Sequence, residues 1–296
     1  MAGDGVFDDD ALIRRIHREQ VMALSGPRAL LMQAAHPVAF AGFFAHTGAL
    51  DEPYERLQRT ARAVELVVFG PRAEAERVTR RVRAMHKRVR GELGEPAGRF
   101  PAGTPYAADD PKLLLWILAT LVDSGLAVYQ RYVRGLSRAE RDAYWRDYRV
   151  FGRMFGLRER DMPATIEDFD DYMRDTRRHD LHVTPAAREL AVEIVMRPPV
   201  PLRMRPLLEA ANFVTVGLLP GELRRQYGFS WDPVRGLALR GHTEYAKRLL
   251  VPLLPGRFRY ADRSHLHAAG QASSRPRARR TSASRAASAA SASSGA

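Results

Sequence analysis

The stretch LLLWILATLVDSGLAV, residues 113–128, is the longest apolar run in the chain and decides the fold class. A membrane-spanning helix needs about 20 consecutive, mostly apolar residues. This run is shorter than that, and Asp123, Ser124 and Gly125 interrupt it. We therefore expect a buried helix in the core of a globular protein, and no transmembrane segment.

Helical spacing of apolar residues continues on both sides of this run, and no stretch alternates convincingly with period two. Gly and Pro mark the boundaries, and Ser137 with Glu140 forms a capping box. Beside the buried run, the predicted helices cover residues 12–24, 29–35 with a restart at 37, 53–68, about 73–93, 137–155, 163–178, 184–196, 207–219 and 231–250. The sequence predicts an all-α fold with one multi-helix domain over residues 1–260.

The last residues, 261–296, differ in composition from the rest of the chain. They are rich in Ser, Ala and Arg, with six Arg and no acid from Arg263 onward. Such a segment cannot bury enough apolar surface to fold, so we expect a disordered tail. The N-terminal MAGDGVFDDD is acidic and has no apolar segment like that of a signal peptide. These features predict a cytoplasmic protein.

Composition excludes several kinds of site. The chain has 296 residues, 45% hydrophobic and 27% charged, with a net charge of +13 and no Cys. Disulfides, thiolate metal sites and iron–sulfur clusters are therefore excluded. Acids and bases are interleaved along the predicted helices, so we interpret most of the charge as solvated surface and expect no specific nucleic-acid partner. The G-x-G-x-x-G, P-loop, HExxH and G-x-S-x-G motifs are absent.

One histidine has an unusual position within the basic segment RRVRAMHKRVRG, residues 80–91. The apolar residues around it recur at steps of three or four and form one helical stripe: Val78, Val82, Met85, Val89 and Leu93. His86 borders that stripe. Spacing alone favours a core histidine bonded to a backbone carbonyl, with a metal or haem ligand as the alternative. A single inward histidine suits haem better than zinc, which takes three or four protein ligands.

Two further features can carry chemistry. His36 lies in an apolar segment directly before Pro37, where its ring can face a cavity or satisfy a backbone group freed by the proline. In RLQRT, residues 56–60, Arg56, Arg59 and Thr60 share a short helical arc. Most arginines in such positions are surface charges, but an inward arc of this kind would bind an anion or a carboxylate.

Several short segments occur in an order that resembles the catalytic domain of the MpaB and rubber-oxygenase (latex clearing protein) family. They are LMQAAHPVAFAG, DEPYERLQRT, VVFG, MHKRVRG, YAADDPKLLLW and DYMRD. Each segment alone is weakly specific, whereas the ordered set is more so, and it covers roughly residues 10–250. The resemblance implies an all-helical protein with a globin-like core that binds haem b.

The resemblance also assigns roles to residues. In the rubber-cleaving members, the proximal iron ligand is a histidine that follows an Arg-x-x-Lys-Thr motif. RLQRT resembles that motif, and His86 follows in the next predicted helix. The resemblance therefore implies that His86 binds the iron and that Arg56, Arg59 and Thr60 line the haem pocket.

This chain departs from the family pattern in two places. The family's lysine, which can lie on the distal face of the iron, is Arg59 here. A guanidinium group is always protonated and has no lone pair for a metal, so we expect a distal position that is open, water-bound or filled by His36. The rubber-cleaving enzymes also have an upstream glutamate proposed as a base, but no carboxylate lies between His36 and His46. Rubber cleavage by the same mechanism is therefore not expected.

Three hypotheses follow from these patterns. The first is a haem-dependent oxygenase that acts with O2 on a small apolar, isoprenoid-like substrate, with Arg59, Thr60 or His36 as catalytic donors. The second is a haem-binding sensor or carrier without turnover, ligated by His36 and His86. The third is a helical interaction protein without a cofactor.

Overall fold

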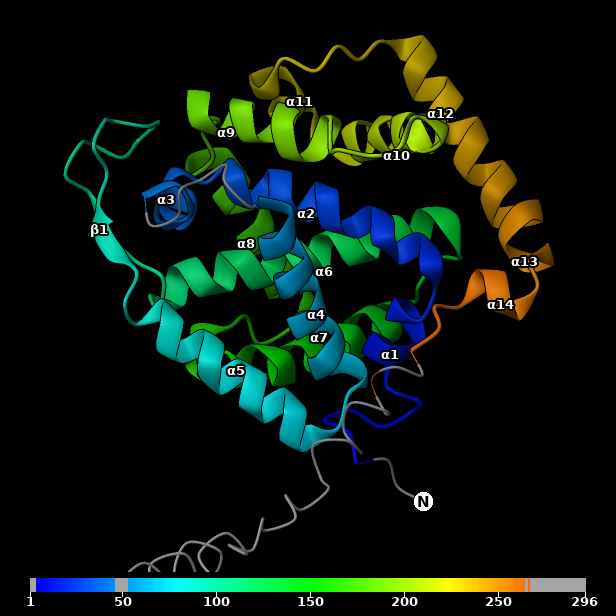
Figure 1. Cartoon of the computed structure of the whole chain (residues 1–296), viewed down its shortest axis with the longest axis horizontal. Coiled ribbons are helices and arrows are strands. Elements are labelled where there is room, and N and C mark those ends of the chain that lie inside the picture. The colour runs from blue at the N-terminus through cyan, green and yellow to red at the C-terminus, as the bar shows by residue number, and fades with distance from the viewer. Residues whose placement is uncertain (1–3, 46–52, 264–265, 267–296) are drawn as a thin grey trace, which may run out of the picture.

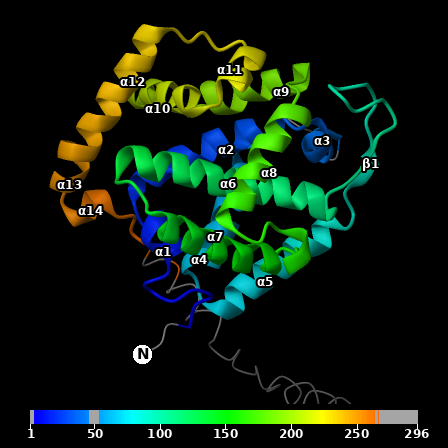
Figure 2. The ribbon, with the colours of Figure 1, turned by 180° about the vertical axis from the view of Figure 1, so that it is seen from behind.

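The computed structural model describes residues 4–45, 53–263 and 266, with side chains throughout except at residues 44, 45, 53–57 and 194. Helices form nearly all of the regular structure (Figures 1 and 2). The described residues contain a single sheet, in which β1 (Arg90–Glu92) pairs antiparallel with β2 (Pro105–Ala107). The predicted all-α fold is confirmed.

The helices follow the predicted order, with several short additions. The first half has α1 (Leu12–His17), η1 (Gln20–Leu24), α2 (Ser25–Ala34), α3 (Pro37–Ala45), α4 (Pro53–Phe69), α5 (Arg72–His86) and α6 (Pro111–Tyr132). The second half has α7 (Arg138–Met154), η2 (Glu159–Asp161), α8 (Ile166–His179), α9 (Pro185–Leu190), the π-helical η3 (Ala191–Met196), η4 (Leu202–Met204), α10 (Arg205–Leu218), α11 (Gly221–Tyr227), α12 (Pro233–Tyr245), the π-helical η5 (Ala246–Leu250), α13 (Val251–Leu253) and α14 (Gly256–Arg259).

The predicted buried helix is α6, which crosses the middle of the molecule between α2 and α7 (Figure 1). Its N-terminus is capped by Asp110, whose carboxylate accepts a hydrogen bond from the backbone N–H of Lys112 at 2.8 Å. Trp116, Val122 and Val128 are fully buried. By length and composition α6 qualifies as a membrane span, but 61% of its apolar window is buried within the protein. Such burial is what the core helix of a globular domain shows.

The polar residues that interrupt the apolar run connect α6 to its neighbours. The buried guanidinium of Arg28 on α2 lies 2.7 Å from the carboxylate of Asp123 and donates to the Ser124 hydroxyl at 2.7 Å. It also donates to the carbonyl of Leu218 on α10. A side chain at Gly125 would place its Cβ 2.3 Å from the Tyr144 hydroxyl. The glycine therefore allows α7 to approach α6 closely.

One predicted boundary is wrong. The helix expected to run to about Leu93 ends at His86, and the chain then turns into the β1–β2 hairpin. Gly91 permits this, because a Cβ there would lie 2.5 Å from the Tyr106 hydroxyl on the facing strand. Val89 and Leu93 therefore do not continue the stripe of the helix. Met85, which was predicted in that stripe, is 51% exposed.

The folded body also extends slightly past the predicted boundary at Tyr260. Arg263 donates to the carbonyl of His17 at 2.7 Å and its guanidinium lies 3.7 Å from the centre of the Phe69 ring. Leu266 is buried. The remainder of the predicted tail, residues 267–296, lies outside the described residues.

Candidate functional site

His86 is the last residue of α5 and lies at the end of that helix's buried face. Ala75 and Thr79 are buried, and Val82 and His86, which follow at steps of three and four residues, are partly buried. The Nδ1 atom of His86 is shielded from solvent. The structure therefore places His86 on the inward side of α5, as the spacing predicts. Its role as an iron ligand remains a prediction.

The RLQRT motif lies on the N-terminal half of α4, on a stretch that the described residues leave uncovered. Residues 58–62, which include Arg59 and Thr60, are all exposed. Five consecutive residues point in every direction around a helix of 3.6 residues per turn, so every side of this stretch reaches solvent. Burial begins at Ala63 and continues at Val67 and Val68. Arg56 lies in the same helix, but its side chain is outside the described residues.

The motif and His86 lie on the two arms of one helical hairpin. Gly70 and Pro71 join α4 to α5, and the two helices contact each other and then diverge from that turn (Figure 1). A Cβ at Gly70 would lie 2.7 Å from the carbonyl oxygen of Leu66, so the turn requires glycine. The hairpin thus carries the exposed motif on one arm and the inward imidazole at the end of the other.

His36 joins α2 to α3 and is buried. Its Nδ1 atom accepts a hydrogen bond from the backbone N–H of Ala39 at 3.2 Å, which caps the first turn of α3. The ring lies against Phe100 and Trp116, with centroids 5.5 Å and 6.0 Å away. Burial lowers the pKa of His36 to about 4, partly offset by a backbone hydrogen bond, and the charge of Arg99 lowers it further. The imidazole is therefore neutral at pH 7.

The structure does not bring every predicted residue to one place. Arg59 and Thr60 are neighbours on α4, and His86 lies on the adjoining helix, whereas the recorded ring contacts of His36 are with Phe100 and Trp116. The predicted backbone role of His36 at Pro37 agrees with its capping bond. Its catalytic role is an expectation that these contacts neither require nor oppose.

Trp116 is a candidate that the sequence interpretation missed. It is fully buried in α6, beside His36, and no hydrogen-bond partner for its Nε1 atom lies among the described residues. A buried indole N–H normally has a partner, so this donor is available to a bound molecule. A tryptophan within the apolar run LLLWILA was the signal, because its N–H cannot be satisfied by aliphatic neighbours.

The side chains that could ligate a metal here agree better with a haem iron than with a metal ion held by protein side chains alone. Among the described residues, no three His, Cys, Asp or Glu side chains cluster closely enough to hold a metal. Haem b requires only one protein ligand on the proximal side. The inward His86 at the end of α5 can supply that ligand, and the exposed guanidinium and hydroxyl of Arg59 and Thr60 lie on the adjoining helix α4.

The chain also matches known proteins. The model of a family described as "ER-bound oxygenase mpaB/B'/Rubber oxygenase, catalytic domain" matches residues 14–248. Two uncharacterised proteins, one from Mycobacterium bovis and one from Mycobacterium tuberculosis, are each 24% identical to it over 181 residues, which is 61% of this chain and 68% of theirs. No solved structure matches the chain. The globin-like core implied by the resemblance therefore stays a prediction.

Proposed function

Since this chain belongs to the MpaB and rubber-oxygenase catalytic-domain family, we propose that it is a haem-dependent oxygenase for a small apolar, isoprenoid-like substrate. The observation that carries the proposal is the α4–α5 hairpin. It carries an inward histidine on one helix and a solvent-exposed Arg-Thr pair on the other, in the order that the family motif has.

His86 would hold the haem iron, and Arg56, Arg59 and Thr60 would line the pocket. Haem b, when bound, supplies the site at which O2 binds and is activated. The inward position of His86 and its buried Nδ1 atom leave the imidazole on the side of α5 that faces the protein, where a metal-binding group would be needed. Arg59 retains its positive charge and can pair with a haem propionate or donate to a bound oxygen.

His36 would act as a hydrogen-bond donor in this scheme and not as a second iron ligand. Its Nδ1 lone pair is used by the cap of α3, so the neutral ring carries its proton on Nε2. That N–H and the indole N–H of Trp116 are two donors in one apolar neighbourhood. Donors held in a dry site can orient a bound oxygen without competing water.

The substrate class follows from the family and from the side chains around His36. Phe100 and Trp116 line that side, which favours an apolar molecule over a charged one. The missing carboxylate between His36 and His46 argues against the base-assisted rubber cleavage of the family's secreted members. Oxygenation of a smaller alkene inside the cytoplasm is our proposal.

The bis-histidine sensor or carrier is the second candidate, and the capping bond of His36 weighs against it. Spectroscopy separates the two. An oxygenase with an open distal face should have a ferric spectrum that azide or imidazole changes, and a reduced form that binds CO. A bis-histidine protein should resist these ligands, and a cofactor-free interaction protein should have no Soret band after expression with abundant haem.

A further inference from the structure

The C-terminal helices carry an unusual amount of exposed apolar surface. Apart from Met85, every large exposed hydrophobic side chain among the described residues lies between Val192 and Phe258. The helix α12 is hardly packed, since only Leu239 and Thr243 of its residues are buried. It follows the outer edge of the molecule, where α13 continues it (Figures 1 and 2). Large contiguous apolar patches of this kind mark interaction sites.

The exposed residues form one stripe along α12, η5 and α13. They follow one another at helical spacing on the side opposite Leu239, Thr243 and Ala246, which pack inward. We call this set the outer stripe: Val234, Leu237, Tyr245, Leu249 and Leu253. Their exposed fractions run from 51% to 77%, so the stripe faces outward over its whole length. A helix that buries one face and exposes a second apolar face has a second partner.

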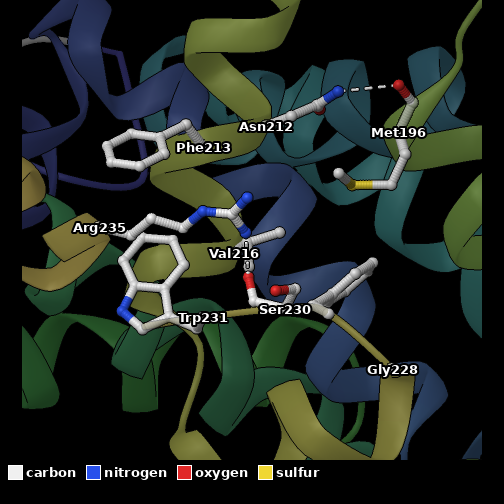
Figure 3. A pocket seen from close by; sticks show the side chains of 9 residues that line it. Met196, Asn212, Phe213, Val216, Gly228, Ser230, Trp231 and Arg235 are labelled. Atoms are coloured by element: carbon white, nitrogen blue, oxygen red, sulfur yellow. Dashed lines mark hydrogen bonds between the residues drawn. The ribbon is translucent and has the colours of Figure 1, made fainter. Parts of the chain in front are cut away.

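An apolar hollow adjoins the N-terminal end of the outer stripe. It has a volume of about 270 Å³ and is lined by Phe213, Val216 and Trp231, among others (Figure 3). Two of its polar side chains are already engaged, because Asn212 donates to the Met196 carbonyl and Arg235 to the Ser230 carbonyl. The hollow therefore adds apolar surface beside the stripe and does not form a polar ligand site.

Basic residues outnumber acidic ones in the segment that carries this apolar surface. Residues 202–258 contain nine Arg and Lys against four Asp and Glu. Arg240 and Arg248 are exposed on α12 and η5, within the same turns as the stripe, and Arg248 also pairs with Glu244 at 2.9 Å. Leu, Val and Tyr on one face with Arg beside them is the pattern of a helix that lies in a membrane interface and attracts anionic headgroups.

Two other occupants fit this face less well. Residues 267–296 contain no Val, Ile, Leu, Met, Phe, Tyr or Trp, so that segment has no large apolar side chains with which to cover the stripe. A second copy packed through the same face would bring two surfaces of like charge together. We propose that the outer stripe docks on a membrane surface containing anionic lipids, with Arg240 and Arg248 among the headgroups. This inference does not depend on the proposed cofactor.

Sedimentation of the full chain with vesicles tests the proposal. We expect binding to vesicles of phosphatidylcholine with phosphatidylglycerol, much weaker binding to pure phosphatidylcholine, and weakening as salt is raised. The double variant Leu237→Ser/Leu249→Ser should lose at least about tenfold in partitioning. Because both positions are exposed, its circular dichroism should match that of the wild type.

The matched control is Leu202→Ser/Leu207→Ser, which changes two exposed leucines of η4 and α10, outside the stripe. Retained vesicle binding by this control supports the stripe. The proposal is overturned if both double variants lose binding equally or if neither does. It is also overturned if light scattering shows a wild-type dimer that Leu237→Ser/Leu249→Ser converts to a monomer, because the stripe then binds a second copy.

Discussion

The Nδ1 atom of His36 accepts a hydrogen bond from the backbone N–H of Ala39 at 3.2 Å, so this histidine begins α3 as its cap. The bond fixes the tautomer of a buried neutral ring. It makes His36 a donor through Nε2, whereas His86 lies inward at the end of α5. The first prediction follows from these two roles, His36 as the cap of α3 and His86 as the proposed iron ligand.

Replacement of His36 by Ala should preserve haem binding and destabilise the fold. Loss of a cap costs about 1 kcal/mol, and the emptied space beside Trp116 adds to that cost. Asn at this position can cap a helix, so His36→Asn should recover part of the stability. Urea unfolding measures the stability, and the Soret absorbance measures the haem. Complete loss of haem from a folded His36→Ala protein would contradict the assignment of His36 as a cap and not as an iron ligand.

Acid should destabilise the protein through its buried histidines. Burial lowers the pKa of His36 to about 4, and burial with the charge of Arg263 lowers the pKa of His17 to about 4. The unfolded chain therefore binds more protons than the folded chain below pH 6.5, so stability falls as the pH drops from 6.5 towards 4. The loss is at most about 3 kcal/mol for each histidine.

Urea titrations at several pH values across that window measure this effect. His17 lies between the hydroxyls of Tyr144 and Tyr148, each 2.9 Å from its Nε2 atom. Gln can still bond to a hydroxyl but does not titrate, so His17→Gln should flatten the pH dependence. An equally steep dependence in His17→Gln and in the wild type would mean that other groups cause the acid instability.

Gly125→Ala should destabilise the core by about 1–3 kcal/mol, which is typical of overpacking. The added Cβ would lie 2.3 Å from the Tyr144 hydroxyl. Tyr144→Phe removes that oxygen, so the double variant should be more stable than the sum of the two single variants predicts. Thermal and urea unfolding of the wild type, the two single variants and the double variant give the interaction free energy between the two positions. Simple additivity would show that α6 and α7 do not meet at this point.

Arg59→Lys should change the distal side of the haem. A lysine amine can lose its proton and bind iron, whereas the guanidinium of Arg59 cannot. We expect the ferric spectrum of the variant to become low-spin as the pH rises and its affinity for azide to fall. Arg59→Gln is the control, since it removes the charge without supplying an amine. Identical spectra for the wild type and Arg59→Lys would place Arg59 away from the iron.

Local spacing was sufficient to predict most helices. Pro37 and Pro53 begin α3 and α4, Gly70 ends α4, and the Ser137–Glu140 capping box begins α7. The end of α5 was not predictable from periodicity, because Val89 and Leu93 continue the helical spacing. Pairing of β1 with β2 and the close contact of Gly91 with Tyr106 outweigh that local pattern.

The candidate site was predicted only in part, because helical spacing can be read from the sequence and contacts between distant segments cannot. The inward position of His86 follows from the steps of three and four along one helix. The packing of the Trp116 indole against His36 depends on a contact between segments far apart in sequence, which spacing cannot give. The outer stripe also needed the structure, because only packing distinguishes the buried face of α12 from its exposed apolar face.

The absorption spectrum of the purified protein tests the central claim, that His86 holds a haem, most directly. The ferric, dithionite-reduced and CO-bound forms of the wild type, His86→Ala and His36→Ala should be compared after expression with abundant haem. We predict a Soret band and a CO complex for the wild type, retention of both in His36→Ala, and loss of haem from a folded His86→Ala protein. Full haem content with an unchanged spectrum in His86→Ala would contradict the account.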